Sequence, residues 1–257
     1  MDKAKKKAAP KMDKYKAKKK AAPKIGFGER FGSLEELKKE FRTCQRCTLS
    51  EECAGRTTLA RGDHAAEIMI VGESPGEEEF REGTPFVGPS GGFLCYAMVA
   101  AHHLIDPALA DYAGDEEHPE VHQIIDDNFY ITNAVMCYPG DRKPTTREYR
   151  ACRNRLWNEI YLVDPKMIIA LGKQAAESLL SRPVAITTEH GKMFKARIPG
   201  LVRPYIEYPV MTLVHPAFVL REGEESKWAV RFVQDLDLAL TTYHKTMEIL
   251  GGDHDGG

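Results

Sequence analysis

The chain has 257 residues, of which 42% are hydrophobic and 9% aromatic, and its formal net charge at pH 7 is −2. This length can bury one sizeable core, and the composition excludes a fully disordered protein. No apolar run approaches the ~20 residues that span a bilayer, and the lysine-rich N-terminus lacks the apolar core of a secretory signal. We therefore expect an intracellular protein, cytoplasmic or nucleoid-associated, with no membrane partner.

The positive charge is concentrated in an N-terminal tail. Residues 1–24 contain eleven lysines and two aspartates, a net charge of +9, so the rest of the chain carries −11. The sequence KAKKKAAPK occurs at 3–11 and again at 16–24. Because this segment has little to bury, we expect residues 1–30 to be a disordered tail. A flexible polycation indicates binding to DNA phosphates, with a solubility or targeting tail as the alternative.

Strand and helix patterns alternate from residue 31 onward. The first helix is expected after Ser33, with Glu36 completing a capping box. The elements predicted after it are a strand at 67–71, a helix at 90–101, a strand at 128–135, a helix at about 145–162, a strand at 166–171, a helix at 172–180, a strand at 209–214 and a helix at 226–240. This alternation predicts a three-layer α/β/α sandwich around a four-stranded parallel sheet.

These elements define one domain with three additions. We place the domain at 31–246 and expect an acidic, poorly periodic insertion at 103–127. Residues 247–257, rich in Gly and Asp, are expected to form a flexible tail. The insertion has no predicted role in the fold.

Four of the six cysteines are candidates for one metal centre. Cys44 and Cys47 form a CxxC pair outside any βαβ context, which disfavours a thioredoxin-like role. Cys137 follows the second predicted strand, and Cys152 lies on the helix after it. Four thiolates suit either a [4Fe–4S] cluster or a structural zinc, and the spacing alone does not choose between them.

The other two cysteines have weaker claims. Cys95 lies within an apolar helix, and we expect it to be part of the core. Cys53 is close enough to the CxxC pair to be a substitute ligand. The prediction for Cys53 is nevertheless an exposed residue without a role.

Polar and glycine-rich segments follow the carboxyl ends of the predicted strands, where ligands bind in parallel sheets. The turn GESPGEEE follows the first strand and carries Glu73. Asn133 ends the second strand, and His215 follows the fourth. The loop TPFVGPSGG, rich in glycine and proline, carries Phe86. We expect these side chains to meet in one cleft.

Four motifs, in order, resemble the type 4 uracil-DNA glycosylases, the iron–sulfur branch of the uracil-DNA glycosylase superfamily. They are GESPGEEE, PFVGPSGG, ITNAVMCYP and VHPAFVL, and they occur with the cysteine pattern over about 44–240. The resemblance implies a DNA-repair hydrolase that flips uracil out of single- or double-stranded DNA and cleaves its N-glycosyl bond, starting base-excision repair. It also implies a [4Fe–4S] cluster held by Cys44, Cys47, Cys137 and Cys152. We expect a monomer.

The same resemblance implies which residues bind the base. Phe86 would stack on the flipped uracil ring. Asn133 offers a donor and an acceptor in one amide, which suits the O4/N3 edge of uracil and rejects cytosine. Backbone groups of the turn at Gly72 and Ser74 would help to hold the base.

Two further residues would carry the chemistry. Glu73 would orient or deprotonate the attacking water, and its charge favours an oxocarbenium-like sugar. His215 would donate a hydrogen bond to uracil O2 as negative charge develops there. Phe218 and Leu220 would wedge into the base stack that the flipped nucleotide vacates.

One departure from the family pattern leaves alternatives open. Residue 74 is Ser where the family usually has Gly or Ala, so a glycosylase for another deaminated base, such as hypoxanthine or xanthine, is one alternative. A non-catalytic iron–sulfur DNA-binding module is a second. In either case we expect Arg142, Lys143 and Arg147, beside the cysteines, to face the DNA.

Overall fold

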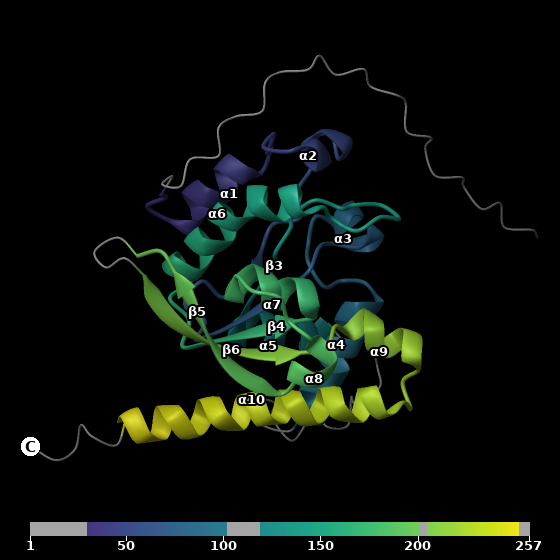
Figure 1. Cartoon of the computed structure of the whole chain (residues 1–257), viewed down its shortest axis with the longest axis vertical. Coiled ribbons are helices and arrows are strands. Elements are labelled where there is room, and N and C mark those ends of the chain that lie inside the picture. Colours follow the sequence, from purple (N-terminus) through teal and green to yellow (C-terminus); the bar gives the residue numbers. More distant parts are fainter. Residues whose placement is uncertain (1–29, 102–118, 201–204, 252–257) are drawn as a thin grey trace, which may run out of the picture.

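The computed structural model describes residues 30–101, 119–200 and 205–251 (Figure 1). Residues 1–29 of the predicted tail and residues 103–118 of the predicted insertion lie outside this range. A sheet of six strands occupies the middle of the molecule, in the order β1-β3-β2-β4-β6-β5. The strands are β1 Arg61–Gly62, β2 Ile68–Gly72, β3 Phe129–Asn133, β4 Met167–Leu171, β5 Lys192–Ile198 and β6 Ile206–Leu213.

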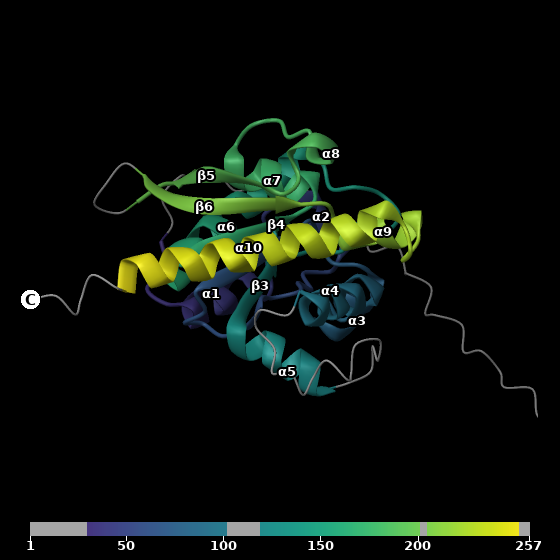
Figure 2. The ribbon, with the colours of Figure 1, turned by 90° about the horizontal axis from the view of Figure 1, so that it is seen from below.

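Helices cover both faces of this sheet. Their bounds are α1 Leu34–Phe41, α2 Thr48–Glu52, α3 Glu77–Glu82, α4 Pro89–Ala100, α5 Pro119–Asn128, α6 Thr146–Val163, α7 Lys173–Leu180, α8 Ile186–Glu189, α9 Pro216–Glu222 and α10 Lys227–Gly251. Residues of α1, α6 and α7 pack on one face, and residues of α4, α9 and α10 pack on the other. Figures 1 and 2 show α10 running along the face opposite α1 and α6. The predicted α/β/α sandwich is confirmed.

The alternation of side chains along the inner strands explains the two layers. In β2, Ile68 and Ile70 contact the α4–α10 layer, while Met69 and Val71 contact the α1–α6 layer. All four are at most 3% exposed. Each inner strand is therefore apolar on both faces, as parallel strands buried between helices must be.

The four predicted strands form the parallel part of the sheet, but the sheet is larger than predicted. β3, β2, β4 and β6 are parallel neighbours, whereas β1 and β5 pair antiparallel at the two edges. β1 has only two residues. β5 has the sequence KMFKARI and is exposed over most of its length. Because it is not an apolar run, it was not predicted as a strand, although it pairs with β6.

Two helices extend into the segments predicted as an insertion and a tail. The predicted insertion at 103–127 ends in a helix, α5, which reaches the start of β3. The closing helix α10 continues to Gly251, inside the segment predicted as a tail at 247–257. Ser33 is the N-cap of α1, as predicted, and its Oγ accepts from the amide of Glu36. The Glu36 carboxylate accepts from the amide of Gly32 instead of completing the predicted capping box with Ser33. No helix in the described ranges is both long and apolar enough to cross a membrane.

Candidate active site and cysteine centre

The carboxyl ends of β2 and β3 lie side by side. Gly72 is the register partner of Asn133, and the backbone pairing continues beyond both strands. The amide of Ala134 donates to the Gly72 carbonyl at 2.9 Å, and the amide of Val135 donates to the Glu73 carbonyl at 3.0 Å. The turn that carries Glu73 is thus held in a fixed place beside Asn133.

A cavity of about 640 Å³ opens at this edge of the sheet. Among the residues that line it are six of the predicted site residues, Glu73, Ser74, Phe86, Asn133, His215 and Leu220. They come from four separate segments of the chain, as the strand-end rule for parallel sheets requires. The structure therefore brings the predicted cleft residues together.

Gly72 makes room for two of these side chains. A Cβ atom at this position would lie 2.2 Å from Asn133 Oδ1 and 2.7 Å from the Phe86 ring. Both distances are far below van der Waals contact, so any larger residue would push these groups away from the strand end. Gly72 is needed here for the close approach of its neighbours.

Phe86 is held in an unusual backbone conformation. Its φ is +56°, in the left-handed region, and its side chain is buried at 4% exposure. A Cβ on Gly91 would lie 2.0 Å from the Phe86 carbonyl oxygen, so the loop folds back tightly on itself. The ring stacks on His215, with centroids 6.4 Å apart. Strained backbone of this kind persists where the surroundings over-determine it, often at functional sites.

Glu79 ties together the two loops that form the site. Its Oε2 accepts from the Gly76 amide at 2.9 Å, and its Oε1 accepts from the Gly88 amide at 3.4 Å. The first amide belongs to the Glu73 turn and the second to the Phe86 loop. Glu79 was not among the predicted site residues, although its spacing of three from Gly76 fits a capping box.

His215 is fixed in one tautomer by the backbone. It is the N-cap of α9, and its Nδ1 accepts a hydrogen bond from the Ala217 amide at 3.1 Å. A neutral imidazole that accepts at Nδ1 carries its proton on Nε2. Burial, and then the charge of Arg221, lowers the pKa of His215 to about 4. The ring is therefore a neutral hydrogen-bond donor at the pH of a cell.

Glu73 has a partner that the sequence did not reveal. The hydroxyl of Tyr149, on α6, donates to Glu73 Oε1 at 2.8 Å. Burial, and then the neighbouring Glu73 carboxylate, raises the pKa of Tyr149 above its ordinary value. Tyr149 therefore remains a donor to this carboxylate. The two residues are 76 positions apart in the chain, so no local pattern could have linked them.

The two predicted wedge residues have different surroundings. Leu220 lines the cavity. Phe218 packs edge-on against Trp228, with ring centroids 5.2 Å apart, and contacts the core layer of α4 and α10. The structure thus places Leu220 at the site and Phe218 in the packing that supports α9.

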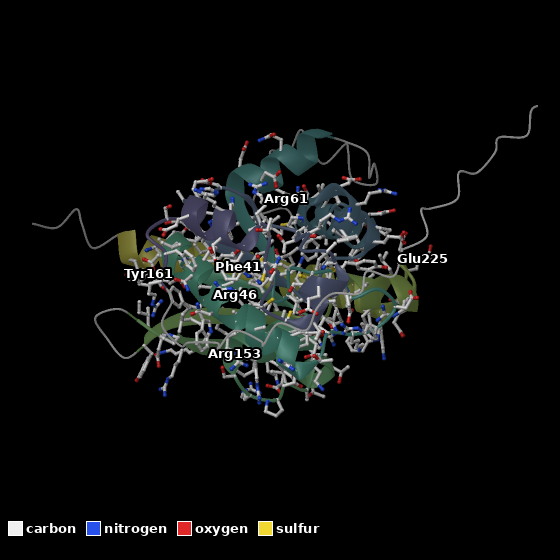
Figure 3. All side chains as sticks on the ribbon, turned by 90° about the horizontal axis from the view of Figure 1, so that it is seen from above. Phe41, Arg46, Arg61, Arg153, Tyr161 and Glu225 are labelled. Carbon is white, nitrogen blue, oxygen red and sulfur yellow. The ribbon has the colours of Figure 1, made fainter. Side chains whose placement is uncertain are left out.

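Five cysteines gather beside α2 and α6. Cys47, Cys53, Cys137 and Cys152 belong to one buried cluster, and Cys44 is buried beside Met136 in the next. We call these five residues the cysteine centre. Arg46, between the CxxC cysteines, lies 4.5 Å from the Phe41 ring centroid and pairs with Glu40 (Figure 3), which anchors the CxxC loop on α1.

Cys53 was wrongly expected to be exposed. It is 4% exposed, and its Sγ lies 3.1 Å from the Tyr138 carbonyl oxygen, to which the thiol donates. Cys137 is a close neighbour that hydrogen-bonds the same thiol. The prediction for Cys95 is confirmed, because it is buried in the core with α4. Five thiols, not four, therefore lie in the centre.

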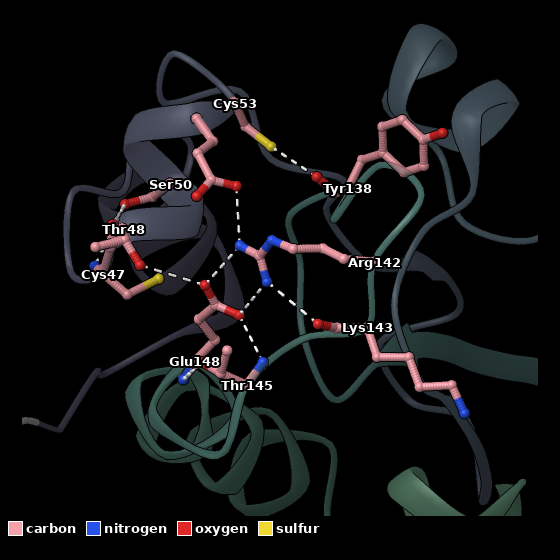
Figure 4. Close-up of polar contacts among 10 residues, drawn as sticks. Cys47, Thr48, Ser50, Cys53, Tyr138, Arg142, Lys143, Thr145 and Glu148 are labelled. Carbon is pink, nitrogen blue, oxygen red and sulfur yellow. Dashed lines mark hydrogen bonds and ion pairs between the residues drawn. The ribbon is translucent and has the colours of Figure 1, made fainter.

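An ion-pair network joins the segments that carry the cysteines. The Arg142 guanidinium lies between Glu52 of α2 and Glu148 of α6, at 2.8 Å from each (Figure 4). Thr48 donates to the same Glu148 carboxylate at 3.3 Å. This pairing with Arg142 lowers the pKa of Glu148 to about 2. Arg142, which is expected to face DNA, thus also holds these segments together, and both Arg142 and Lys143 line the cavity.

A fully buried cation lies behind the site. Arg155 of α6 is fully buried and pairs with Glu159 at 2.5 Å. It donates to Thr132 at 2.9 Å and to the carbonyl oxygens of Asn133 and Ala134. The end of β3 that carries Asn133 is therefore held from below by a side chain of α6, which the sequence analysis also missed.

The described side chains form no group of three or more His, Cys, Asp or Glu close enough to hold one metal ion. In a [4Fe–4S] cluster each cysteine binds a different iron, so its ligands stand wider apart than ligands of one ion. Burial raises the pKa of Cys44 above its ordinary value and that of Cys152 to about 11. Thiols that are costly to ionise without a cation, gathered in one buried place, fit such a cluster.

Fold and site together define a known class. Residues 59–237 match the family described as the Uracil DNA glycosylase superfamily. The chain belongs to this superfamily, as the four motifs indicated.

The individual relatives are named as type-4 and type-5 uracil-DNA glycosylases. The chain is 31% identical over 227 residues to a type-4 uracil-DNA glycosylase of Sulfurisphaera tokodaii, covering 86% of this chain and 91% of that protein. It is 30% identical over 194 residues to a type-4 uracil-DNA glycosylase of Pyrobaculum aerophilum, covering 74% and 85%. A type-5 uracil-DNA glycosylase of Thermus thermophilus is 34% identical over 185 residues, covering 62% and 77%.

Proposed function

We propose that this protein is a DNA-repair enzyme that removes uracil from DNA by hydrolysis of the N-glycosyl bond and thereby starts base-excision repair. One observation carries the proposal: Glu73, Phe86, Asn133 and His215 line a single cavity at the carboxyl ends of parallel strands. A base inside a duplex cannot reach such a cavity, so the enzyme must flip the nucleotide out of the stack. The substrate is single- or double-stranded DNA, and the enzyme works as a monomer.

The base is recognised by stacking and by one amide. Phe86 provides the flat face, and its tightly folded loop keeps the ring in place without any movement on binding. Asn133 pairs with the O4/N3 edge of uracil. Cytosine presents the opposite pattern at this edge and would leave a buried amide unpaired, which is how polar sites reject a wrong ligand. Backbone groups at Gly72 and Ser74 complete the contacts to the base.

His215 stabilises the leaving group. When the glycosyl bond breaks, negative charge develops on uracil O2. The neutral imidazole, with its proton on Nε2, donates a hydrogen bond to this oxygen. Because the Ala217 amide holds Nδ1, the donor is oriented before the reaction begins, and such preorganised donors are the most effective.

Glu73 acts on the other side of the bond. Its carboxylate orients the attacking water and takes up its proton as the water adds to the sugar. The same negative charge favours the oxocarbenium-like sugar in the transition state. Leu220, which lines the cavity, fills the gap that the flipped nucleotide leaves in the stack. Phe218, packed against Trp228, supports α9 and is not a wedge residue in this proposal.

The cysteine centre holds a [4Fe–4S] cluster, with Cys44, Cys47, Cys137 and Cys152 as ligands. When bound, the cluster cross-links the CxxC loop, the segment after β3 and helix α6 and so stabilises the frame of the site. The buried thiols from these three segments support this assignment. The relatives named type-4 uracil-DNA glycosylases also support it.

The ligand set has a direct test. Purified protein should be brown and contain iron, and Cys→Ala at each of the four ligand positions should remove colour and iron. Cys53→Ala should keep both, although Cys53 is equally buried, and Cys95→Ala is the control outside the centre. Colourless protein with stoichiometric zinc contradicts the iron assignment. If Cys53→Ala loses iron while one of the four variants retains it, Cys53 would be the ligand in place of that cysteine.

The activity is tested with a panel of oligonucleotides, each carrying one uracil, hypoxanthine or xanthine, in single- and double-stranded form. We expect strand cleavage at uracil after alkaline treatment, with the other lesions excised more slowly. A preference for hypoxanthine or xanthine would assign another base and point to Ser74. Binding without any excision would indicate a DNA-binding module and would contradict the proposal.

A further inference from the structure

Tyr149 touches both functional parts of the protein. Its hydroxyl donates to Glu73 Oε1 at 2.8 Å, and its ring packs against the buried cluster that contains Cys47, Cys137 and Cys152. Tyr149 and Cys152 are three residues apart on α6, so they share one face of this helix. One side chain therefore connects the cysteine centre to the acidic residue of the cavity.

This contact limits the freedom of Glu73. Glu73 stands on a turn, and its backbone carbonyl is already tied to the Val135 amide. The carboxylate at the end of its flexible side chain needs a partner of its own to point steadily toward a water molecule. A hydroxyl on a half-buried, packed ring is such a partner. Because packing fixes the position of the ring, the hydrogen bond favours one position of the carboxylate.

We propose that Tyr149 is the positioning residue of Glu73 and that it holds the carboxylate from a ring anchored in the cysteine centre. The inference rests on the proposed function, because it assumes that Glu73 orients the attacking water. Tyr149 itself touches no reacting atom. Its effect is confined to the chemical step.

The test is the substitution Tyr149→Phe, which keeps the ring against the cysteines and removes only the hydroxyl. Losing a hydrogen bond to an ionised group should lower the single-turnover rate of uracil excision about 10- to 100-fold. The Kd for uracil-containing DNA and the iron content should stay at the wild-type values. Excision at the wild-type rate would overturn the proposal, and so would a loss explained by weaker DNA binding or lower iron content.

Tyr208 offers a matched control. Its hydroxyl donates to Asp164 Oδ1 at 3.0 Å, in another partly buried tyrosine–carboxylate pair away from the cavity. Tyr208→Phe removes the same kind of bond and should leave the excision rate unchanged. A similar fall in both variants would show a general loss of stability instead of positioning.

A double-mutant cycle separates positioning from a structural role. If Tyr149 acts through Glu73, then Tyr149→Phe should cause no further loss in a Glu73→Ala background. Residues that act independently give losses that multiply. Multiplying losses in the cycle would overturn the proposal even if the single variant is slow.

One readout does not depend on catalysis. Crystal structures should show the Glu73 carboxylate in one position in the wild type and displaced or in several rotamers in Tyr149→Phe. An unchanged carboxylate in the variant would overturn the proposal. If wild-type protein fails to excise uracil, the proposed function falls, while this pair of structures still decides whether Tyr149 positions Glu73.

Discussion

His215 has one nitrogen committed before any substrate arrives. Since Nδ1 accepts from the Ala217 amide, only Nε2–H is left to serve the leaving group. Loss of one such donor typically costs ~10²–10³ in rate, so His215→Ala should lower single-turnover excision on this scale. The Kd for uracil-containing DNA should change little. The idea would be wrong if His215→Ala excised uracil at the wild-type rate.

The pH dependence at this residue has a defined sign. The pKa of His215 is lowered to about 4, mainly by burial, whereas the same group has a pKa of about 6.5 in an unfolded chain. The imidazole thus stays neutral through the physiological range. Protonation of Nδ1 would replace the acceptor of the Ala217 amide by an N–H group and break this hydrogen bond. We expect no step in the excision rate near pH 6.5 and a fall as the pH drops toward 4. A step near 6.5 that disappears in His215→Ala would contradict this.

The same difference affects stability. Because the unfolded chain binds this proton more readily, the contribution of neutral His215 to folding is complete above pH 6.5 and is lost as the pH falls toward 4. Chemical denaturation of wild type and His215→Ala across this range measures it. The gap in unfolding free energy between the two should change with pH in this window only. A gap that is constant from pH 7 to pH 4 would refute the shift.

At the scale of single residues, the site residues that lie within sequence motifs could be predicted. Their supporting partners on another helix could not. Gly72, Glu73, Phe86, Asn133 and His215 stand in recognisable segments at strand ends, and the structure places them around one cavity. The supporting partners lie on another helix, far along the chain, and are ordinary residues in sequence. Only the packing of α6 against β3 decides which of them meet the site.

At the scale of elements, regular and apolar segments were predictable, and polar ones were not. The four inner strands are buried on both faces and stand out as apolar runs. β5 is charged because its outer face meets water, and it is a strand only because β6 offers it hydrogen bonds. α5 comes directly before β3, and its mixed, acidic sequence has little of the periodicity that marks a helix packed on a core.

The network of Arg142 predicts how α2 depends on α6. Glu148 is 1% exposed, and Arg142 neutralises it, so Arg142→Met would leave a buried carboxylate with only neutral partners. We expect a loss of about 1–3 kcal/mol in unfolding free energy. Hydrogen exchange in α2 should accelerate, and iron should be released faster to a chelator.

The matched control is Arg197→Met, which removes an exposed ion pair with Glu207 on the edge of the sheet. This pair is open to solvent, and its loss should leave both α2 exchange and iron release unchanged. If Arg142→Met behaves like Arg197→Met, the network does not hold α2 in place.

At the scale of the whole molecule, an acidic body must approach a polyanion. Residues 1–24 carry +9 and the remainder −11, and we expect this positive segment to promote the encounter with DNA. Each phosphate contact contributes a slope of about −0.9 to log K against log salt on duplex DNA. Deleting residues 1–24 should weaken binding at low salt and flatten this slope by several units.

The chemical step should not depend on the tail. Single-turnover excision at saturating enzyme should therefore be the same with and without residues 1–24. A solubility or targeting tail predicts equal salt slopes for both proteins, and equal slopes would decide against a role in DNA binding.

Helix α6 fixes the spacing between two centres that perform different tasks. Four side chains of this helix reach different parts of the molecule. Glu148 joins the ion-pair network and Tyr149 contacts the Glu73 carboxylate. Cys152 lies among the thiols, and Arg155 contacts the end of β3. Since each residue turns a helix by about 100°, inserting one residue between Tyr149 and Cys152 would swing one centre away from its partners whenever the other stayed in register. A substitution in α6 removes one of these contacts, whereas an insertion displaces a whole set of them together. A relative without these cysteines would lose the packing around the Tyr149 ring. In such a protein, we expect another residue to hold the Glu73 carboxylate.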